Sequence, residues 1–194
     1  MKPLPIDFYQ RDTTKVAREL LGKKLFHKRN NQLTSGIIIE TEAYLGLADP
    51  ACHTYNGRNT ARVQSMYKMG GHSYVYFIYG IHFCVNVVTQ NEKKPEAVLI
   101  RALTPMDGID VMRVRRKLKE GKPDKDLCSG PGKLCQAMGI DRSSDGLLLT
   151  GSELWIEEDI PYSKIKTKID SGARVGIDYA GDAKHWPLRF KIKV

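Results

Sequence analysis

The chain has 194 residues, of which 41% are hydrophobic and 27% charged, a composition typical of a soluble globular domain. No run approaches the roughly 18 apolar residues that a membrane-spanning helix needs, and no apolar stretch like that of a secretory signal follows the first residues. We therefore expect one domain over residues 1–194 that does not contact a membrane. The expected location is cytoplasmic, in association with the nucleoid if the source is bacterial.

The charge balance favours an acidic partner. The chain contains 31 Lys and Arg residues against 22 Asp and Glu residues, which gives a formal net charge of +9. Such an excess suits a nucleic acid, because basic side chains neutralise phosphates and release their counterions. Many basic proteins bind no nucleic acid, so the charge is compatible with this partner without identifying it.

The cysteines predict neither disulfides nor a zinc site. Without a secretory signal, the four cysteines are expected to be reduced and mostly buried. Cys52 and His53 are adjacent, but no second pair of this kind completes a structural zinc site. We expect no metal and no cofactor. The cysteines are Cys52, Cys84, Cys128 and Cys135.

Helix and strand signals follow one another without regular βαβ alternation. Asp12 can cap a helix that runs to about Leu21, and Gly22 would end it. Asp49-Pro50 and Asn56-Gly57 are turn signals that mark a loop. The other elements predicted outside the hairpin described below are strands at Leu25–His27 and Gly36–Glu42, a helix at Thr60–Tyr67, a strand at Ala97–Leu103, helices at Gly108–Glu120 and Ser129–Met138, and strands at Leu154–Glu157, Arg174–Ile177 and Leu188–Ile192.

A β-hairpin is predicted in the middle of the chain. Two strands, Ser73–Tyr79 and His82–Thr89, are joined tightly at Gly80. Tyr79 then lies at or beside the tip, where a side chain projects outward. Strands that arrive in hairpins favour the α+β class with a mainly antiparallel sheet.

The segment Ile37–Tyr79 contains most of the candidate chemistry. An apolar run leads into Glu40 and Glu42, and these carboxylates share one strand face with Tyr44. An ionisable group at the edge of a buried strand is unfavourable unless something uses or neutralises it. With one histidine and further tyrosines nearby, this face suits a pocket for a flat, electron-poor ring; the nearby residues are His53, Tyr74, Tyr76 and Tyr79.

Short blocks of sequence extend this pattern over most of the chain. They are, in order, Glu40-Thr41-Glu42-Ala43-Tyr44, His53, Tyr76-Phe77-Ile78-Tyr79-Gly80, Asn86, Leu99-Ile100-Arg101-Ala102-Leu103, Cys128-Ser129-Gly130-Pro131-Gly132-Lys133-Leu134-Cys135, Ala173-Arg174-Val175-Gly176 and Pro187-Leu188-Arg189-Phe190. In this order they resemble the alkyladenine (3-methyladenine) DNA glycosylase family. The region around residues 141–170 is the least similar.

The resemblance implies a fold and an activity. The fold is a single compact domain with a curved, mainly antiparallel sheet, flanking helices and a protruding β-hairpin that intercalates into DNA. The activity is that of a monofunctional DNA glycosylase, which flips damaged purines out of duplex DNA and excises them with water in base excision repair. The implied substrates are alkylated or deaminated purines of the 3-methyladenine, 7-methylguanine, hypoxanthine and ethenoadenine class. The implied partner is double-stranded DNA containing damaged purines, bound by a monomer.

Hydrolysis of the glycosidic bond requires a water molecule and a carboxylate that orients or deprotonates it. The resemblance assigns this general base to Glu42, and it assigns Arg101 and the backbone carbonyl of Val175 to holding the water. An arginine beside the carboxylate also favours its ionised form. From sequence alone, Glu42 could be a strand-end surface carboxylate and Arg101 a salt-bridge partner. Glu40 is expected to make structural hydrogen bonds.

Base flipping requires a pocket. By resemblance, Tyr44 stacks on one side of the flipped base, while His53 and Tyr76 line the rest, with the backbone N–H of His53 donating to the base. Ring faces attract a cationic purine by roughly 0.5–2 kcal/mol. Asn86 is expected on the pocket floor, where it opposes the exocyclic amine of guanine. The alternative for the tyrosines is core packing, which we favour for Tyr74.

Two further segments are expected to contact DNA. By resemblance, Tyr79 enters the minor groove and fills the gap left by the flipped nucleotide. The block from Ser129 to Lys133 predicts a helix start that faces phosphates, with Ser129 as the cap and Pro131 in the first turn. The phosphate contacts are assigned to Ser129, Gly130 and Lys133. A nucleotide P-loop is excluded because the GxxxxGK[ST] pattern is absent.

Two other functions remain in consideration. One is a non-catalytic nucleic-acid-binding module of the same fold, which the presence of the intact catalytic and wedge residues disfavours. The other is a metal-dependent hydrolase, disfavoured because its candidate ligands have no recognised spacing. Those ligands would be Glu40, Glu42, Asp49 and His53.

Overall fold

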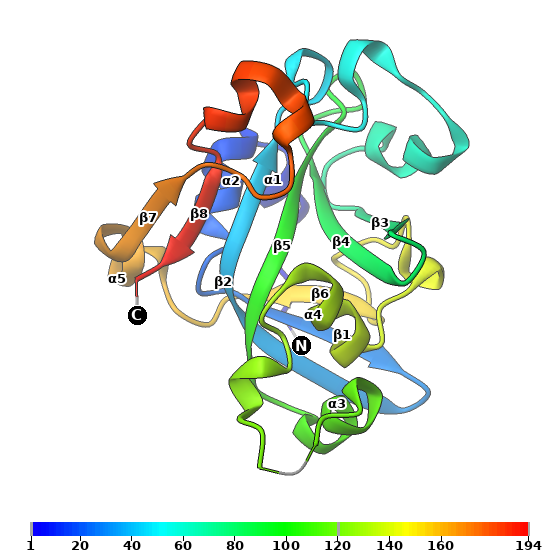
Figure 1. The fold of residues 1–194 in the computed structure, drawn as a ribbon, viewed down its shortest axis with the longest axis vertical. Helices are drawn as coiled ribbons and strands as arrows, with labels where there is room; N and C mark the ends of the chain where they lie inside the picture. Colours follow the sequence, from blue (N-terminus) through cyan, green and yellow to red (C-terminus); the bar gives the residue numbers. More distant parts are fainter. Residues whose placement is uncertain (1, 120, 194) are drawn as a thin grey trace.

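One curved sheet organises the molecule (Figure 1). The computed structural model describes residues 2–119 and 121–193, and within them the sheet has eight strands. The strands are β1 (Lys24–Arg29), β2 (Gln32–Tyr44), β3 (Ser73–Ile78), β4 (His82–Thr89), β5 (Glu96–Pro105), β6 (Leu154–Glu157), β7 (Ile169–Gly172) and β8 (Arg189–Ile192). All pairings are antiparallel, in the order β3-β4-β5-β2-β1-β6, with β8 between β2 and β7.

Strand β2 is the longest and carries the candidate carboxylates. Its first half pairs with β1 and its second half, at Glu40–Glu42, pairs with β8, while β5 runs along its other edge. The register between β2 and β5 shifts on both sides of Glu40. Irregularities of this kind bend a strand and re-aim its side chains, so the carboxylate end of β2 turns away from the direction of its first half.

Helices cover the sheet and close the core. They are α1 (Ile6–Tyr9), α2 (Thr13–Glu19), α3 (Ile109–Arg116), α4 (Pro131–Met138) and α5 (Tyr162–Ile165), with short 3-10 segments between them. In Figure 1, α1 and α2 lie behind the sheet, and α3 and α4 lie in front of it. Asp12 caps α2 as predicted, accepting the N–H of Lys15 at 2.9 Å. Apolar residues from both layers and the sheet form one core, including Leu20, Ile38, Ile100, Leu134 and Phe190. The predicted α+β class is confirmed.

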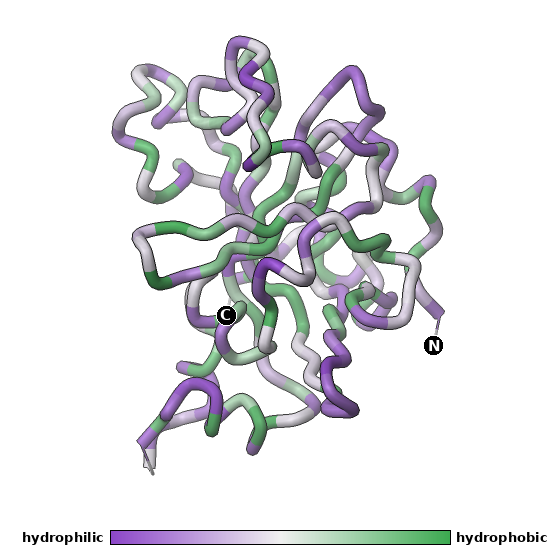
Figure 2. Tube along the Cα trace, turned by 90° about the vertical axis from the view of Figure 1, so that its right-hand side faces the viewer, coloured by the Kyte–Doolittle hydropathy of each residue, from purple (hydrophilic) through white to green (hydrophobic). Residues whose placement is uncertain are grey.

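The predicted hairpin is present and projects from the body of the molecule. Ile78 and His82 form the last pair of β3 and β4, and the turn between them has positive φ at Tyr79 (54°) and Gly80 (70°). Figure 2 shows the hairpin extending to the left, with hydrophobic residues along it. Tyr79 and Ile81 are 78% and 71% exposed. An apolar tip in water indicates a binding surface.

Two of the predicted elements differ in the structure. Helix α3 ends at Arg116, because Lys117 adopts the left-handed conformation and the N–H groups of Lys117 and Leu118 bond to carbonyls of the last turn; Glu120 lies outside the described residues. Residues Arg174–Ile177 form a loop, and the strand near the C-terminus that the sequence did not predict is β7. The short helix predicted at Thr60–Tyr67 is present at Ala61–Tyr67, as a 3-10 helix. Among the described residues, none of the helices is long and apolar enough to cross a membrane.

Candidate active site

A cavity of about 710 Å³ opens where the end of β2, the β3–β4 hairpin, the start of α4 and the loop at residues 173–177 meet. Every site residue predicted from the sequence lines this cavity, with the exception of Glu42. The fold therefore brings together segments that are far apart in sequence. The lining residues that had been predicted are Tyr44, His53, Tyr76, Tyr79, Asn86, Arg101, Ser129, Gly130, Lys133 and Val175.

Glu42 lies directly behind this lining. Its side chain is fully buried, and each of its oxygens is hydrogen-bonded. Oε1 accepts the backbone N–H of Val175 at 2.8 Å. Oε2 accepts the hydroxyl of Tyr44 at 2.8 Å and lies 3.2 Å from Nη1 of Arg101. All three neighbours line the cavity, so the carboxylate lies close behind the cavity wall.

Burial raises the pKa of Glu42 above its ordinary value. The charge of Arg101 acts in the opposite direction, as do the hydrogen bonds from Val175 and Tyr44. The sequence-based expectation that Arg101 favours the ionised form is correct in direction. Burial is the larger effect, however, and the result is a carboxylate that accepts a proton more readily than an exposed glutamate does.

Glu40 makes the structural contacts that were predicted for it. Its Oε1 accepts Nε of Arg101 at 2.9 Å and Nε of Arg189 at 2.6 Å. Arg101 thus bridges Glu40 and Glu42, two residues of the same strand face. This bridge fixes the guanidinium at the wall of the cavity.

Aromatic rings form one wall. Nδ1 of His53 lies 2.8 Å from the hydroxyl of Tyr74, and the His53 ring meets the Tyr76 ring edge-on, with centroids 4.6 Å apart. Burial, followed by the charges of Arg62 and Arg58, lowers the pKa of His53 to about 4, so its ring is neutral at pH 7. Tyr74 is almost completely buried, in agreement with the packing role expected for it, although it also borders the cavity.

Asn86 sits on β4 opposite Tyr74 and faces the cavity. Its side chain is buried, and Nδ2 donates to the carbonyl of Tyr74 at 3.0 Å. This bond fixes the amide in place. A buried, oriented amide at the cavity wall is a rigid steric and polar feature that a bound ring has to accommodate.

The start of α4 differs from the prediction. Gly130 is the N-cap residue and Pro131 is the first helical residue, whereas Ser129 does not cap the helix. Instead, the Ser129 hydroxyl donates to the carbonyl of Asp126 at 3.3 Å and accepts a hydrogen bond from Nζ of Lys133 at 3.2 Å. The helix start and Lys133 still face the cavity.

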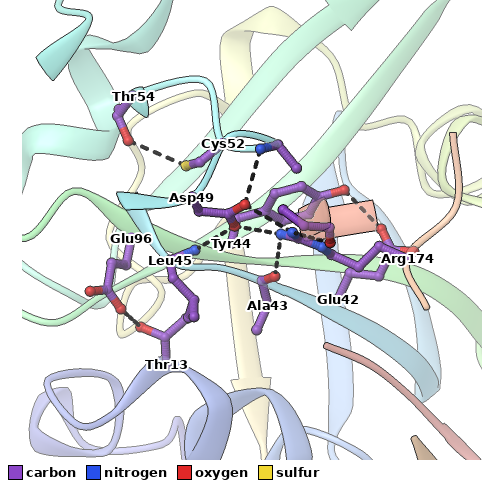
Figure 3. Close-up of polar contacts among 12 residues, drawn as sticks. Thr13, Glu42, Ala43, Tyr44, Leu45, Asp49, Cys52, Thr54, Glu96 and Arg174 are labelled. Carbon is purple, nitrogen blue, oxygen red and sulfur yellow. Dashed lines mark hydrogen bonds and ion pairs between the residues drawn. The ribbon is translucent and has the colours of Figure 1, made fainter. Parts of the chain in front are cut away.

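A buried ion pair behind the pocket was missed by the sequence analysis (Figure 3). Arg174 donates to both carboxylate oxygens of Asp49, at 2.5 and 2.8 Å, and to the carbonyl of Ala43 at 3.0 Å. Asp49 in turn accepts the N–H groups of Leu45 and Ala51, each at 3.0 Å. Both side chains are completely buried. The only sequence signals were a turn at Asp49-Pro50 and the Ala173–Gly176 block.

Other lining residues also escaped the sequence analysis. Arg62 and Tyr179 border the cavity from segments predicted as a helix and as an unassigned C-terminal stretch. His82 lies against the first turn of α4, where a Cβ atom on Gly132 would come within 2.8 Å of the His82 ring. This close approach explains the glycine in that turn and joins the hairpin to the helix.

The ligands considered for a metal-dependent hydrolase do not converge. Glu40 and Glu42 are bound to arginines, and Asp49 is bound to Arg174. Within residues 2–119 and 121–193, no group of three or more His, Cys, Asp or Glu side chains is arranged to hold a metal ion.

Comparison with known proteins adds independent information. Residues 7–194 match a family model described as methylpurine-DNA glycosylase (MPG). A protein of Bdellovibrio bacteriovorus is 50% identical over 193 residues, covering 98% of this chain and 95% of its own. Proteins of Desulfitobacterium hafniense (47% identical, covering 100% and 96%) and Clostridium acetobutylicum (50% identical, covering 96% and 92%) are similarly close. Each carries the name "Putative 3-methyladenine DNA glycosylase".

Proposed function

This chain belongs to the methylpurine-DNA glycosylase family, whose members are hydrolases acting on N-glycosyl bonds in DNA, and we propose that it excises alkylated or deaminated purines from duplex DNA by attack of water. The family resemblance predicted from the sequence is confirmed. The proposed substrates are 3-methyladenine, 7-methylguanine, hypoxanthine and ethenoadenine, removed as the first step of base excision repair. The proposed partner is double-stranded DNA containing such a purine, bound by a monomer in the cytoplasm.

The observation that carries this proposal is the convergence of the predicted residues on one cavity next to Glu42. A volume of about 710 Å³ is in the usual range for a small-molecule site and leaves room for a purine and part of its sugar. Because a base inside a duplex cannot reach such a cavity, the nucleotide has to flip out of the stack.

We assign the general base to Glu42. Its raised pKa suits a group that accepts a proton during the reaction. A water molecule reaches the carboxylate only if Tyr44, Arg101 or Val175 shifts, since these residues cover it in the free protein. Catalytic hydrogen bonds commonly reach their working geometry only with substrate bound, so this arrangement is compatible with the assignment.

The remaining roles follow from position around the cavity. Tyr44 supplies one stacking surface, and Tyr76 and His53 supply further aromatic lining. Asn86 limits the space available to a 2-amino group. Tyr79, exposed on the hairpin tip, occupies the gap in the base stack.

Backbone contacts hold the DNA over the cavity. The first residues of α4 line the cavity, a helix start attracts phosphate oxygens, and Lys133 adds a positive charge there. The formal charge of +9 strengthens association with any duplex, and the pocket then selects the damaged nucleotide.

The decisive experiment is a panel of duplexes that each contain one lesion, scored for abasic sites after single-turnover incubation. Abasic sites in at least one lesion duplex, with none in the matched undamaged duplex, are expected. Binding without abasic sites on every lesion would identify a non-catalytic binding module instead. The same assay with EDTA should give unchanged rates, and borohydride should trap no covalent adduct, because water and not a lysine amine attacks the sugar.

A further inference from the structure

Two of the aromatic rings that line the cavity each lie beside an arginine. Cζ of Arg174 lies 4.8 Å from the centroid of the Tyr44 ring, and Cζ of Arg62 lies 5.3 Å from the centroid of the Tyr76 ring. Tyr44 lines the cavity whereas the fully buried Arg174 does not. The Arg174 guanidinium therefore covers the ring face that is turned away from the cavity and leaves the other face for a base.

Arg174 cannot leave this position easily. Its guanidinium is held by both oxygens of Asp49 and by the carbonyl of Ala43, with no exposed surface on either charged side chain. Asp49 is itself fixed by two backbone N–H groups (Figure 3). The charge behind Tyr44 is consequently a permanent part of the pocket wall.

A charge in this place changes how the ring interacts with a base. An aromatic face attracts a cation through its negative quadrupole. A guanidinium on one face of the ring already interacts with this quadrupole. Its positive charge also repels a second cation that stacks on the opposite face. The ion pair of Asp49 and Arg174 is neutral as a whole, but the positively charged guanidinium of Arg174 is the group that lies over the Tyr44 ring. A neutral purine stacks by dispersion and does not meet this repulsion.

We propose that Arg174, supported by Arg62 beside Tyr76, is a specificity-determining residue that disfavours positively charged purines relative to neutral ones. This proposal rests on the proposed function, because it requires the flipped base to stack on Tyr44. It modifies the expectation from sequence that the tyrosine rings select cationic lesions. The favoured substrate class is the neutral damaged purine, such as hypoxanthine or ethenoadenine.

The test compares two lesions in one assay. 7-Methylguanine carries a positive charge while it is attached to deoxyribose, and hypoxanthine does not. Single-turnover excision rates on the two duplexes are measured for wild type and for the double variant Asp49→Asn/Arg174→Met, which removes both charges of the buried pair together. The rate on 7-methylguanine divided by the rate on hypoxanthine should rise by about two- to thirtyfold, as expected for a cation–ring term of roughly 0.5–2 kcal/mol.

A purely structural role would lower both rates by the same factor, and an unchanged ratio would overturn the proposal. Arg18→Met is the matched control, because Arg18 lies 4.7 Å from the centroid of the Phe190 ring and neither residue lines the cavity. This control should leave the ratio as it is in wild type.

A second variant covers the case in which the double variant does not fold. Arg62 is exposed, so Arg62→Gln removes the other guanidinium without opening the core. The same ratio should rise, and a constant ratio would again overturn the proposal. Failure of the proposed function is seen separately, as a wild-type protein that excises neither lesion.

Discussion

The backbone N–H of Val175 donates to Oε1 of Glu42 at 2.8 Å, across 133 residues of sequence. The preceding residue, Arg174, donates to the carbonyl of Ala43, which follows Glu42 in β2. Two adjacent residues of one loop therefore donate hydrogen bonds to two adjacent residues of one strand. The geometry of the candidate general base depends on this loop as much as on the sheet.

Replacing Glu42 with Gln should nearly abolish excision and leave the affinity for lesion-containing DNA intact. The amide keeps the shape of the side chain but cannot accept the proton, and a general base typically contributes about 10²–10⁴-fold to the rate. Single-turnover rates and binding titrations on one lesion duplex measure the two quantities. Glu40→Gln is the matched control on the same strand face and should lose less activity. A Glu42→Gln rate above about a tenth of wild type would contradict the assignment.

The excision rate should fall at acidic pH, with a midpoint above the ordinary pKa of a glutamate. Burial raises the pKa of Glu42, and the reaction needs its deprotonated form, so activity is present above this raised pKa and lost as the pH falls through it. The pH–rate profile of the wild type measures the midpoint.

His53 provides the control for this profile. Its pKa is lowered to about 4, so it stays neutral over the pH range in which Glu42 is expected to titrate. His53→Gln should keep the acidic decline at the same midpoint. Loss of the decline in this variant would assign the titration to the histidine.

Tyr79→Ala should weaken lesion-specific binding and excision together, with a smaller effect on binding to undamaged duplex. The ring is 78% exposed at the hairpin tip, so its removal costs little packing and is expected to act on the base stack. Ile81→Ala removes another exposed side chain from the same tip and serves as the control. Equal losses on damaged and undamaged DNA would make Tyr79 an ordinary contact.

Asn86→Ser or Asn86→Ala should relax the exclusion of guanine bases without improving the excision of hypoxanthine. The buried amide is fixed by its bond to the Tyr74 carbonyl, and its removal relieves a clash only for bases that carry a 2-amino group. Rates on 7-methylguanine, guanine and hypoxanthine duplexes decide the matter. Equal changes on all three would indicate a role in the fold.

Local signals predicted most of the elements. The Asp12 cap, the hairpin around Gly80 and the helix ending at Gly139 all depend on residues within a few positions of each other, and each is present in the structure. The end of α3 was not predictable in this way, because Lys117 takes a left-handed conformation that usually indicates glycine.

The site was predictable only where it coincides with sequence blocks. The block residues identified the carboxylate and the cavity wall, but not the pairing of Arg174 with Asp49, which are separated by 125 residues. Nothing local to either residue requires a partner. Their burial, and thus the charge behind Tyr44, results from how three segments pack together.

The backbone conformation of Tyr79 lowers the stability of the hairpin turn at the position proposed to contact DNA. A non-glycine residue in the left-handed region is strained by roughly 1–2 kcal/mol, and Tyr79 adopts this conformation with φ of 54°. Glycine would relax the turn, yet it would leave no ring to enter DNA. If Tyr79 enters the base stack as proposed, the chain retains a less stable residue at the position that contacts DNA, and a single turn then carries a trade-off between folding and function.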